Sequence, residues 1–89
     1  MKWYVYIIES DIGSLYTGIS TDVIRRFKEH SSKGPKGAKF FRSCCPKSIA
    51  WQEEHENRSS ALQRELAIKK MTREEKLQLI ERYQRDNKN

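Results

Sequence analysis

A chain of 89 residues is long enough for one small domain with a single hydrophobic core, and it is too short for two such domains. Charged residues make up 34% of the chain, and two tryptophans, four tyrosines and three phenylalanines argue against intrinsic disorder. No apolar run approaches the ~18 residues of a membrane span, and the N-terminus lacks the zones of a signal peptide, so we expect a cytoplasmic protein without membrane contact.

The net charge of +6 is concentrated in one segment. Residues 25–47 carry eight basic side chains and a single acidic one, Glu29. A localised basic stretch of this kind is typical of proteins that bind a polyanion, most often nucleic acid. The alternative is a solvated loop whose charge serves only solubility.

The N-terminal residues predict a β-hairpin. Residues 2–9 are β-branched and aromatic at both alternating positions, which is typical of a strand covered on both faces. Residues 10–14 have turn-forming chemistry, and residues 15–19 resume an extended pattern. Tyr6 and Tyr16 would therefore lie on paired strands and come close if the register allows, with Gly18 leaving room for a close approach of the backbone.

A helix is predicted directly after the hairpin. Residues 20–22 offer N-cap side chains, and the helix that they start extends to about residue 31. Its apolar face carries Val23, Ile24 and Phe27. Arg26 and His30 lie one helical turn apart on a neighbouring face.

The sixteen residues 31–46 show no regular pattern, and a connection of this length is typically functional or mobile. Cys44 and Cys45 are adjacent, so a bridge between them would be severely strained, and the spacing of a zinc site is missing. We expect both to be free thiols. Phe40 and Phe41 are expected to anchor this loop, with base stacking as the alternative.

A third strand and two helices complete the predicted fold. The strand covers residues 49–53, and the second helix opens at Ser59 and Ser60, where Ser60 and Gln63 fit a capping box. Thr72 and Glu75 form a second capping box at the start of the third helix. The order β-β-α-β-α-α predicts a single α+β domain over residues 1–84, with residues 85–89 as a frayed polar tail.

The second predicted helix carries an acidic residue among apolar ones. Glu65 lies between Ala61 and Ile68 in a stripe with helical spacing, and buried carboxylates are rare unless they are paired or metal-bound. A carboxylate that holds Mg²⁺, an arginine that binds phosphate and a tyrosine or histidine that orients or deprotonates water are what phosphodiester hydrolysis needs.

Each candidate also has a simpler interpretation. The two tyrosines would pack in the core as ordinary strand residues, and Arg26 would lie on a solvated helix face. His30 would complement the helix dipole, and Glu65 would form an ion pair with Lys69 one turn later.

Taken together, these residues resemble the GIY-YIG nuclease superfamily over most of the chain, from Tyr4 to about Lys70. The first motif is similar to residues 4–6 (Tyr-Val-Tyr) and the second to residues 16–18 (Tyr-Thr-Gly). The family arginine, which falls ten residues after the second-motif tyrosine, matches Arg26, the histidine one turn later matches His30, and the glutamate of the next helix matches Glu65. The closer resemblance is to a small, single-domain, uncharacterised bacterial subgroup of this superfamily.

The resemblance implies a three-stranded antiparallel sheet flanked by helices. It implies a metal-dependent DNA endonuclease or nickase that serves DNA repair or processing. Tyr6 and Tyr16 would position or activate water, and His30 would assist as a base or a phosphate contact. Arg26 would bind phosphate, and Glu65 would hold a single Mg²⁺ or Mn²⁺ ion.

The basic side chains would then bind the nucleic-acid backbone, and those expected to do so are Arg25, Lys33, Lys36, Lys39, Arg42 and Lys69. Family nucleases usually join this module to a DNA-binding domain or partner, so affinity here would come from the basic segment itself or from another protein that supplies targeting. Two other functions stay open: a non-catalytic nucleic-acid-binding module that retains the fold, and a protein-interaction adaptor whose basic loop binds an acidic partner.

Overall fold

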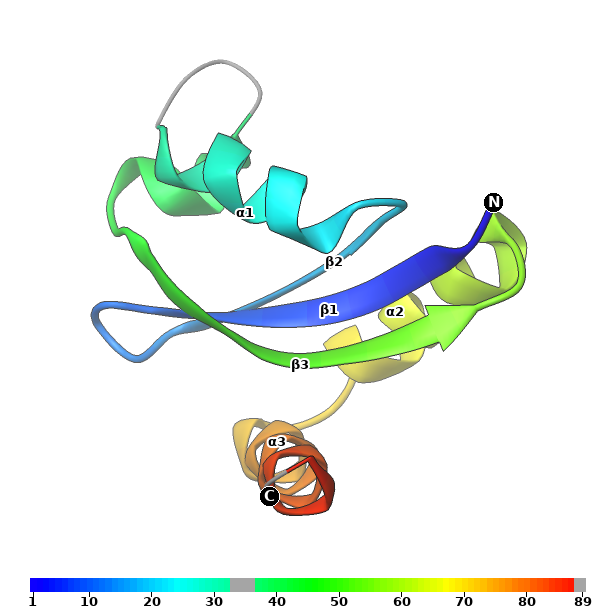
Figure 1. Cartoon of the computed structure of the whole chain (residues 1–89). Helices are drawn as coiled ribbons and strands as arrows, with labels where there is room; N and C mark the ends of the chain where they lie inside the picture. The colour runs from blue at the N-terminus through cyan, green and yellow to red at the C-terminus, as the bar shows by residue number, and fades with distance from the viewer. Residues whose placement is uncertain (33–36, 88–89) are drawn as a thin grey trace.

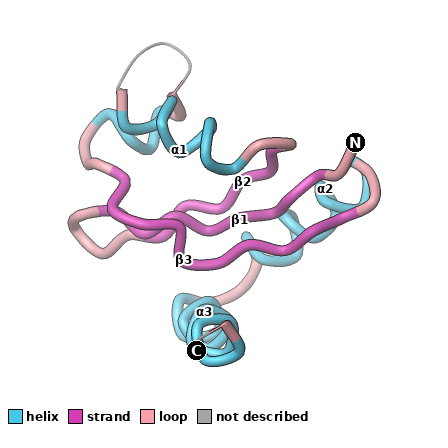
Figure 2. The backbone as a smooth tube through the Cα atoms, viewed as in Figure 1, coloured by secondary structure: helices cyan, strands magenta, loops and turns pink. Residues whose placement is uncertain are grey.

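The computed structural model describes residues 1–32 and 37–87. The elements follow in the order β1 (Trp3–Ser10), β2 (Leu15–Ser20), α1 (Val23–Ser31), the short 3₁₀ helix η1 (Lys39–Arg42), β3 (Pro46–His55), α2 (Arg58–Lys69) and α3 (Arg73–Asp86). The strands form one antiparallel sheet with β1 between β2 and β3 (Figures 1 and 2). This confirms the predicted α+β fold with a three-stranded antiparallel sheet flanked by helices.

Helices cover both faces of the sheet, with α1 on one side and α3 on the other in Figure 1. The core is accordingly divided into two clusters. On one face α1 and η1 contribute Val23 and Phe41, which join Tyr6 and Ile8. On the other face, α2 and α3 pack Ala61, Ile68 and Ile80 against Val5 and Ile7. As predicted, β1 is covered on both faces, because none of its residues 5–8 is more than 1% exposed.

Local side-chain chemistry sets the ends of the first elements. In the turn between β1 and β2, the hydroxyl oxygen of Ser10 accepts hydrogen bonds from the backbone N–H groups of Ile12 and Ser14. Gly13 adopts a φ of 83°, a left-handed conformation that side chains disfavour. Asp22 then caps α1 by accepting from the backbone N–H of Arg25 at 3.1 Å. These contacts direct α1 back across the sheet.

Several predicted boundaries differ from the structure. Asn57, rather than Ser60, caps α2, and its side chain accepts from the Ser60 N–H at 2.8 Å. The strand β3 runs over Pro46–His55, beyond the predicted residues 49–53, because its ends are extended by pairing with β1 across two register irregularities. The irregular segment contains η1, and α3 continues to Asp86. Across the described ranges, no helix combines the length and apolar character that crossing a membrane requires.

Candidate active site

The register of the hairpin places Tyr6 directly opposite Gly18 and Tyr16 two pairs further along, opposite Ile8. The Tyr6 ring lies across Gly18, because a Cβ built on that glycine would be 2.6 Å from the Tyr6 hydroxyl oxygen and 2.8 Å from Cζ. The ring centroids of Tyr6 and Tyr16 are 6.3 Å apart. Gly18 therefore makes room for an aromatic side chain, whereas the sequence suggested a close approach of the backbone.

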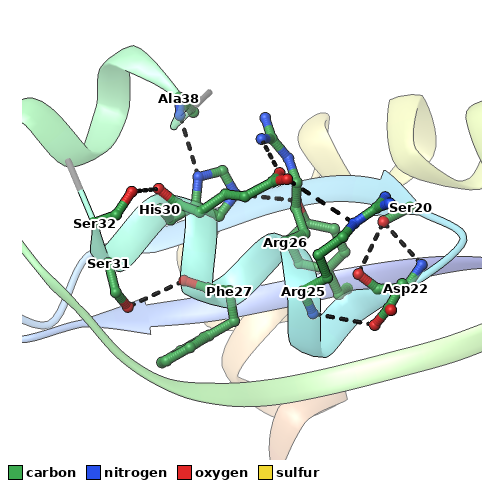
Figure 3. A network of polar contacts seen from close by, with 11 residues as sticks. Ser20, Asp22, Arg25, Arg26, Phe27, His30, Ser31, Ser32 and Ala38 are labelled. Carbon is green, nitrogen blue, oxygen red and sulfur yellow. Dashed lines mark hydrogen bonds and ion pairs between the residues drawn. The ribbon is translucent and has the colours of Figure 1, made fainter. Parts of the chain in front are cut away.

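The histidine of α1 contacts the first of these tyrosines. His30 is completely buried, and its Nε2 lies 3.2 Å from the Tyr6 hydroxyl oxygen. Its Nδ1 accepts a hydrogen bond of 3.1 Å from the backbone N–H of Ala38 (Figure 3). Burial, and to a smaller extent the charge of Arg26, lower the pKa of His30 to about 4, with Glu29 partly opposing both effects. The imidazole is therefore neutral at neutral pH.

The segment around η1 closes the aromatic cluster on the same side. Phe41 is 1% exposed, and its ring centroid lies 4.7 Å from that of His30 and 5.2 Å from that of Tyr16. Phe40 packs against Tyr16 at 5.3 Å and remains partly exposed. The two phenylalanines thus anchor the connection between α1 and β3, as the sequence led us to expect.

Arg26, one turn before His30, lies beside the buried pair. Its Nη1 donates to the Glu29 carboxylate at 2.9 Å, and its side chain is 26% exposed. Burial strongly raises the pKa of Tyr6, the neighbouring Tyr16 raises it further, and the charge and hydrogen bond of Arg26 act in the opposite direction. Arg26 therefore acts on the Tyr6 hydroxyl and still reaches the surface.

Glu65, on α2, lies within electrostatic range of the Tyr6 hydroxyl. Its side chain is 13% exposed and forms an ion pair of 3.2 Å with Lys69. Its charge also contributes to raising the pKa of Tyr6, so the carboxylate lies within electrostatic range of that hydroxyl. The ion pair that the simpler interpretation anticipated is present, yet the carboxylate is largely buried rather than solvated.

The candidate site draws on four elements, because Tyr16 of β2, Arg26 and His30 of α1 and Glu65 of α2 each contact Tyr6 of β1 or act on its hydroxyl through their charge. They differ in access to solvent. Tyr6 and His30 are 1% and 0% exposed, whereas Tyr16, Arg26 and Glu65 are partly exposed. The buried pair forms the floor of the site, and the other three side chains line its surface.

The donor set fits a magnesium-type ion better than zinc. In residues 1–32 and 37–87 there is no group of three or more His, Cys, Asp or Glu side chains that could hold a metal. Zinc sites need three or four such ligands, whereas Mg²⁺ keeps several waters and binds through one or two carboxylates together with substrate phosphates. Glu65, a single largely buried carboxylate, is suited to that second mode.

The predicted nucleic-acid contacts lie mainly on the side of α1 and η1. Arg25, Lys39 and Arg42 are exposed, and Lys69 is 52% exposed beside Glu65. Arg25 also lies 3.9 Å from Glu29. Lys33 and Lys36 lie outside the described residues.

The sequence missed three contributors to this site. Glu29 supports Arg26, and its spacing of three residues on a helix was a usable signal. The Ala38 amide has no sequence signal, because any residue except proline supplies a backbone N–H. His55, which bonds to both Glu53 and Ser60, helps to fasten α2 to β3 and so holds the helix that carries Glu65.

Comparison with known proteins identifies the family of this chain. Residues 2–78 match the model of the GIY-YIG catalytic domain. The chain is 44% identical to a UPF0213 protein of Streptococcus sanguinis, with 89% of this chain and 88% of that protein covered. It is 49% identical to a UPF0213 protein of Haloquadratum walsbyi, with 88% and 85% covered.

A solved structure has the same fold. The solution NMR structure of a UPF0213 protein from Bacillus halodurans matches with a TM-score of 0.57 and 40% identity, over 91% of this chain and 84% of that one. The family model spans most of the chain, and the relatives match over nearly their full length. The chain therefore belongs to the GIY-YIG family, a nuclease-type family, and within it to the small UPF0213 proteins.

Proposed function

We propose that this domain hydrolyses phosphodiester bonds in nucleic acid, with DNA as the preferred substrate, in a reaction that depends on Mg²⁺ or Mn²⁺. The observation that carries the proposal is that Tyr16, Arg26 and Glu65, from three separate elements, all lie within electrostatic range of the Tyr6 hydroxyl, and that all three are partly exposed. A core that served stability alone would have no need of a guanidinium and a carboxylate on the same floor of buried aromatic rings.

Each exposed side chain has a role that its chemistry supports. Arg26 would bind the scissile phosphate through its charged N–H groups and stabilise charge that develops on the phosphate oxygens. The hydroxyl of Tyr16 would orient the attacking water. Glu65 would hold the divalent ion, which supplies stabilisation of the leaving oxygen when bound. Lys69, which pairs with Glu65 and is half exposed, would contact a phosphate.

Replacing the proposed metal ligand tests this function. The Glu65→Gln variant keeps the shape of the side chain and removes its charge, so nicking of supercoiled plasmid DNA in Mg²⁺ or Mn²⁺ should fall at least 100-fold. Glu74→Gln, on the exposed first turn of α3, is the matched control and should cleave like the wild type. Equal cleavage by both variants would refute the assignment of Glu65. Circular dichroism would show that both are folded.

A second candidate, a nucleic-acid-binding module without catalysis, is favoured by the exposed cations Arg25, Lys28, Lys39 and Arg42 on α1 and η1. Binding through phosphate contacts weakens as the salt concentration rises. The slope of log affinity against log salt concentration is proportional to the number of phosphates contacted. If this candidate is correct, neutralising Lys39 and Arg42 reduces that slope while no cleavage occurs with either metal. A chain that binds an acidic protein and no nucleic acid would favour the adaptor instead.

A further inference from the structure

The hydrogen bonds of His30 determine which of its two ring nitrogens carries the proton. Its Nδ1 receives the backbone N–H of Ala38 at 3.1 Å, and a backbone N–H only donates. Nδ1 must therefore carry a lone pair. A neutral imidazole has one proton, so that proton is on Nε2.

The second contact of the ring then has a defined direction. Nε2 faces the Tyr6 hydroxyl at 3.2 Å, so Nε2–H donates and the tyrosine oxygen accepts. The charge of Arg26 also acts on the Tyr6 hydroxyl, where a guanidinium can only donate. No lone pair of His30 therefore faces Tyr6.

We propose that His30 is a positioning residue rather than the general base of this site: the Ala38 amide fixes it as a hydrogen-bond donor to Tyr6, and Tyr6 in turn holds the Arg26 guanidinium. The role in catalysis rests on the proposed function, whereas the direction of the hydrogen bonds does not. Of the two tyrosines, only Tyr16 is exposed enough to touch water or phosphate directly.

The surroundings of His30 keep it in this state over the working pH range. Among the residues that the structure describes, the titratable and charged groups that face it are Arg26 and Glu29 from its own helix, Tyr6 from β1 and Tyr16 from β2. On the remaining side, η1 presents the apolar ring of Phe41. Burial and Arg26 hold the pKa of His30 at about 4, so the ring takes up no proton near neutral pH.

The first experiment observes the tautomer directly, without substrate or metal. Two-bond ¹H–¹⁵N correlation spectra of the protein with ¹⁵N-labelled histidine distinguish a protonated from an unprotonated ring nitrogen. For His30 we expect an unprotonated Nδ1 and a protonated Nε2 at pH 7, unchanged down to pH 5. A protonated Nδ1 at pH 7, in either the neutral or the charged ring, would overturn the proposal.

The second experiment separates positioning from base catalysis in the nicking assay. In His30→Gln the amide nitrogen takes the place of Nε2 and still donates to Tyr6, but it cannot accept a proton. Loss of one hydrogen bond corresponds to roughly tenfold, whereas loss of a general base costs about 10²–10⁴-fold. We expect kcat of His30→Gln to stay within tenfold of the wild type, with an unchanged acidic limb of the pH profile.

His30→Asn is the matched control, because its shorter amide overlays Nδ1 and restores only the contact with Ala38. We expect it to lose more activity than His30→Gln and to show a raised KM, since Arg26 would lose its support. A 10²–10⁴-fold loss of kcat in a folded His30→Gln variant would refute the positioning role. An inactive wild type would refute the proposed function and leave the spectroscopic result standing.

Discussion

At the scale of single residues, access and hydrogen-bond direction divide the five family-like side chains into two kinds. Tyr6 and His30 are buried and form a hydrogen bond with each other, whereas Tyr16, Arg26 and Glu65 reach the surface of the protein. The sequence identified all five by type and spacing, but spacing is the same for a residue that touches substrate and for one that supports it. Only burial and the partners of each polar atom distinguish the two.

Gly18 is the residue on which the position of Tyr6 depends most directly. A methyl group at this position would overlap the Tyr6 ring, which cannot move freely because it is buried and bonded to His30. We expect Gly18→Ala to lower the free energy of unfolding by about 1–3 kcal/mol, the usual cost of overpacking. Denaturant unfolding with circular dichroism measures the change.

A double-mutant cycle supplies the control for this prediction. In a Tyr6→Leu background the clash is relieved, so the penalty of Gly18→Ala should shrink to less than half. An equal penalty in both backgrounds would show that the cost arises from the strand itself and not from the tyrosine ring.

At the scale of elements, capping decides where the helices begin. The Thr72 and Glu75 capping box is present as predicted, with 3.2 Å from the Glu75 N–H to the Thr72 hydroxyl and 2.9 Å from the Thr72 N–H to the Glu75 carboxylate. At α2 the predicted box was wrong, because Asn57 three residues earlier takes the cap position. Both positions offered suitable side chains, and in the structure the side chain of Asn57 accepts from the Ser60 N–H.

Removing the cap of α3 should destabilise the fold without affecting the site. Thr72→Ala leaves the Glu75 N–H without its partner, so we expect a loss of about 1 kcal/mol in unfolding free energy. Ser59→Ala, in the exposed first turn of α2, is the control and should change stability by less than about 0.5 kcal/mol. Because α3 contributes none of the five site residues, nicking activity below the melting temperature should be unchanged. Equal melting temperatures for Thr72→Ala and the wild type would contradict the prediction.

At the scale of the whole molecule, His30 links stability to pH. Its pKa is about 4 in the folded protein against 6.5 for an unperturbed histidine, so the unfolded chain binds the extra proton between these values. Stability is therefore fully present above pH 6.5 and falls as the pH drops toward 4. The shift corresponds to a loss of order 3 kcal/mol from this group.

The contribution of His30 is measured against a variant that cannot titrate. Urea unfolding at pH 7 and pH 4.5 should show a larger loss for the wild type than for His30→Gln, since acidic groups titrate equally in both. If the unfolding free energies of the wild type and His30→Gln fall equally between pH 7 and pH 4.5, His30 has the same proton affinity in the folded and unfolded states, and the prediction is wrong.

Much of the fold was determined by short stretches of sequence. The turn at residues 10–14, the Asp22 cap and the Thr72 box act between residues a few positions apart, so local chemistry suffices to predict the hairpin, α1 and the start of α3. The two-sided apolar pattern of β1 likewise predicted a strand covered by helices on both faces.

The tertiary structure alone decided how the site is organised. The register that sets Tyr6 over Gly18, the Ala38 amide that fixes the His30 proton, and the approach of Glu65 from another helix join residues 8 to about 60 positions apart. Such contacts depend on strand pairing and packing that no local propensity encodes. The amino-acid sequence by itself named the candidate groups, whereas the fold decided which of them reach the surface and which are buried, because burial depends on packing between distant segments.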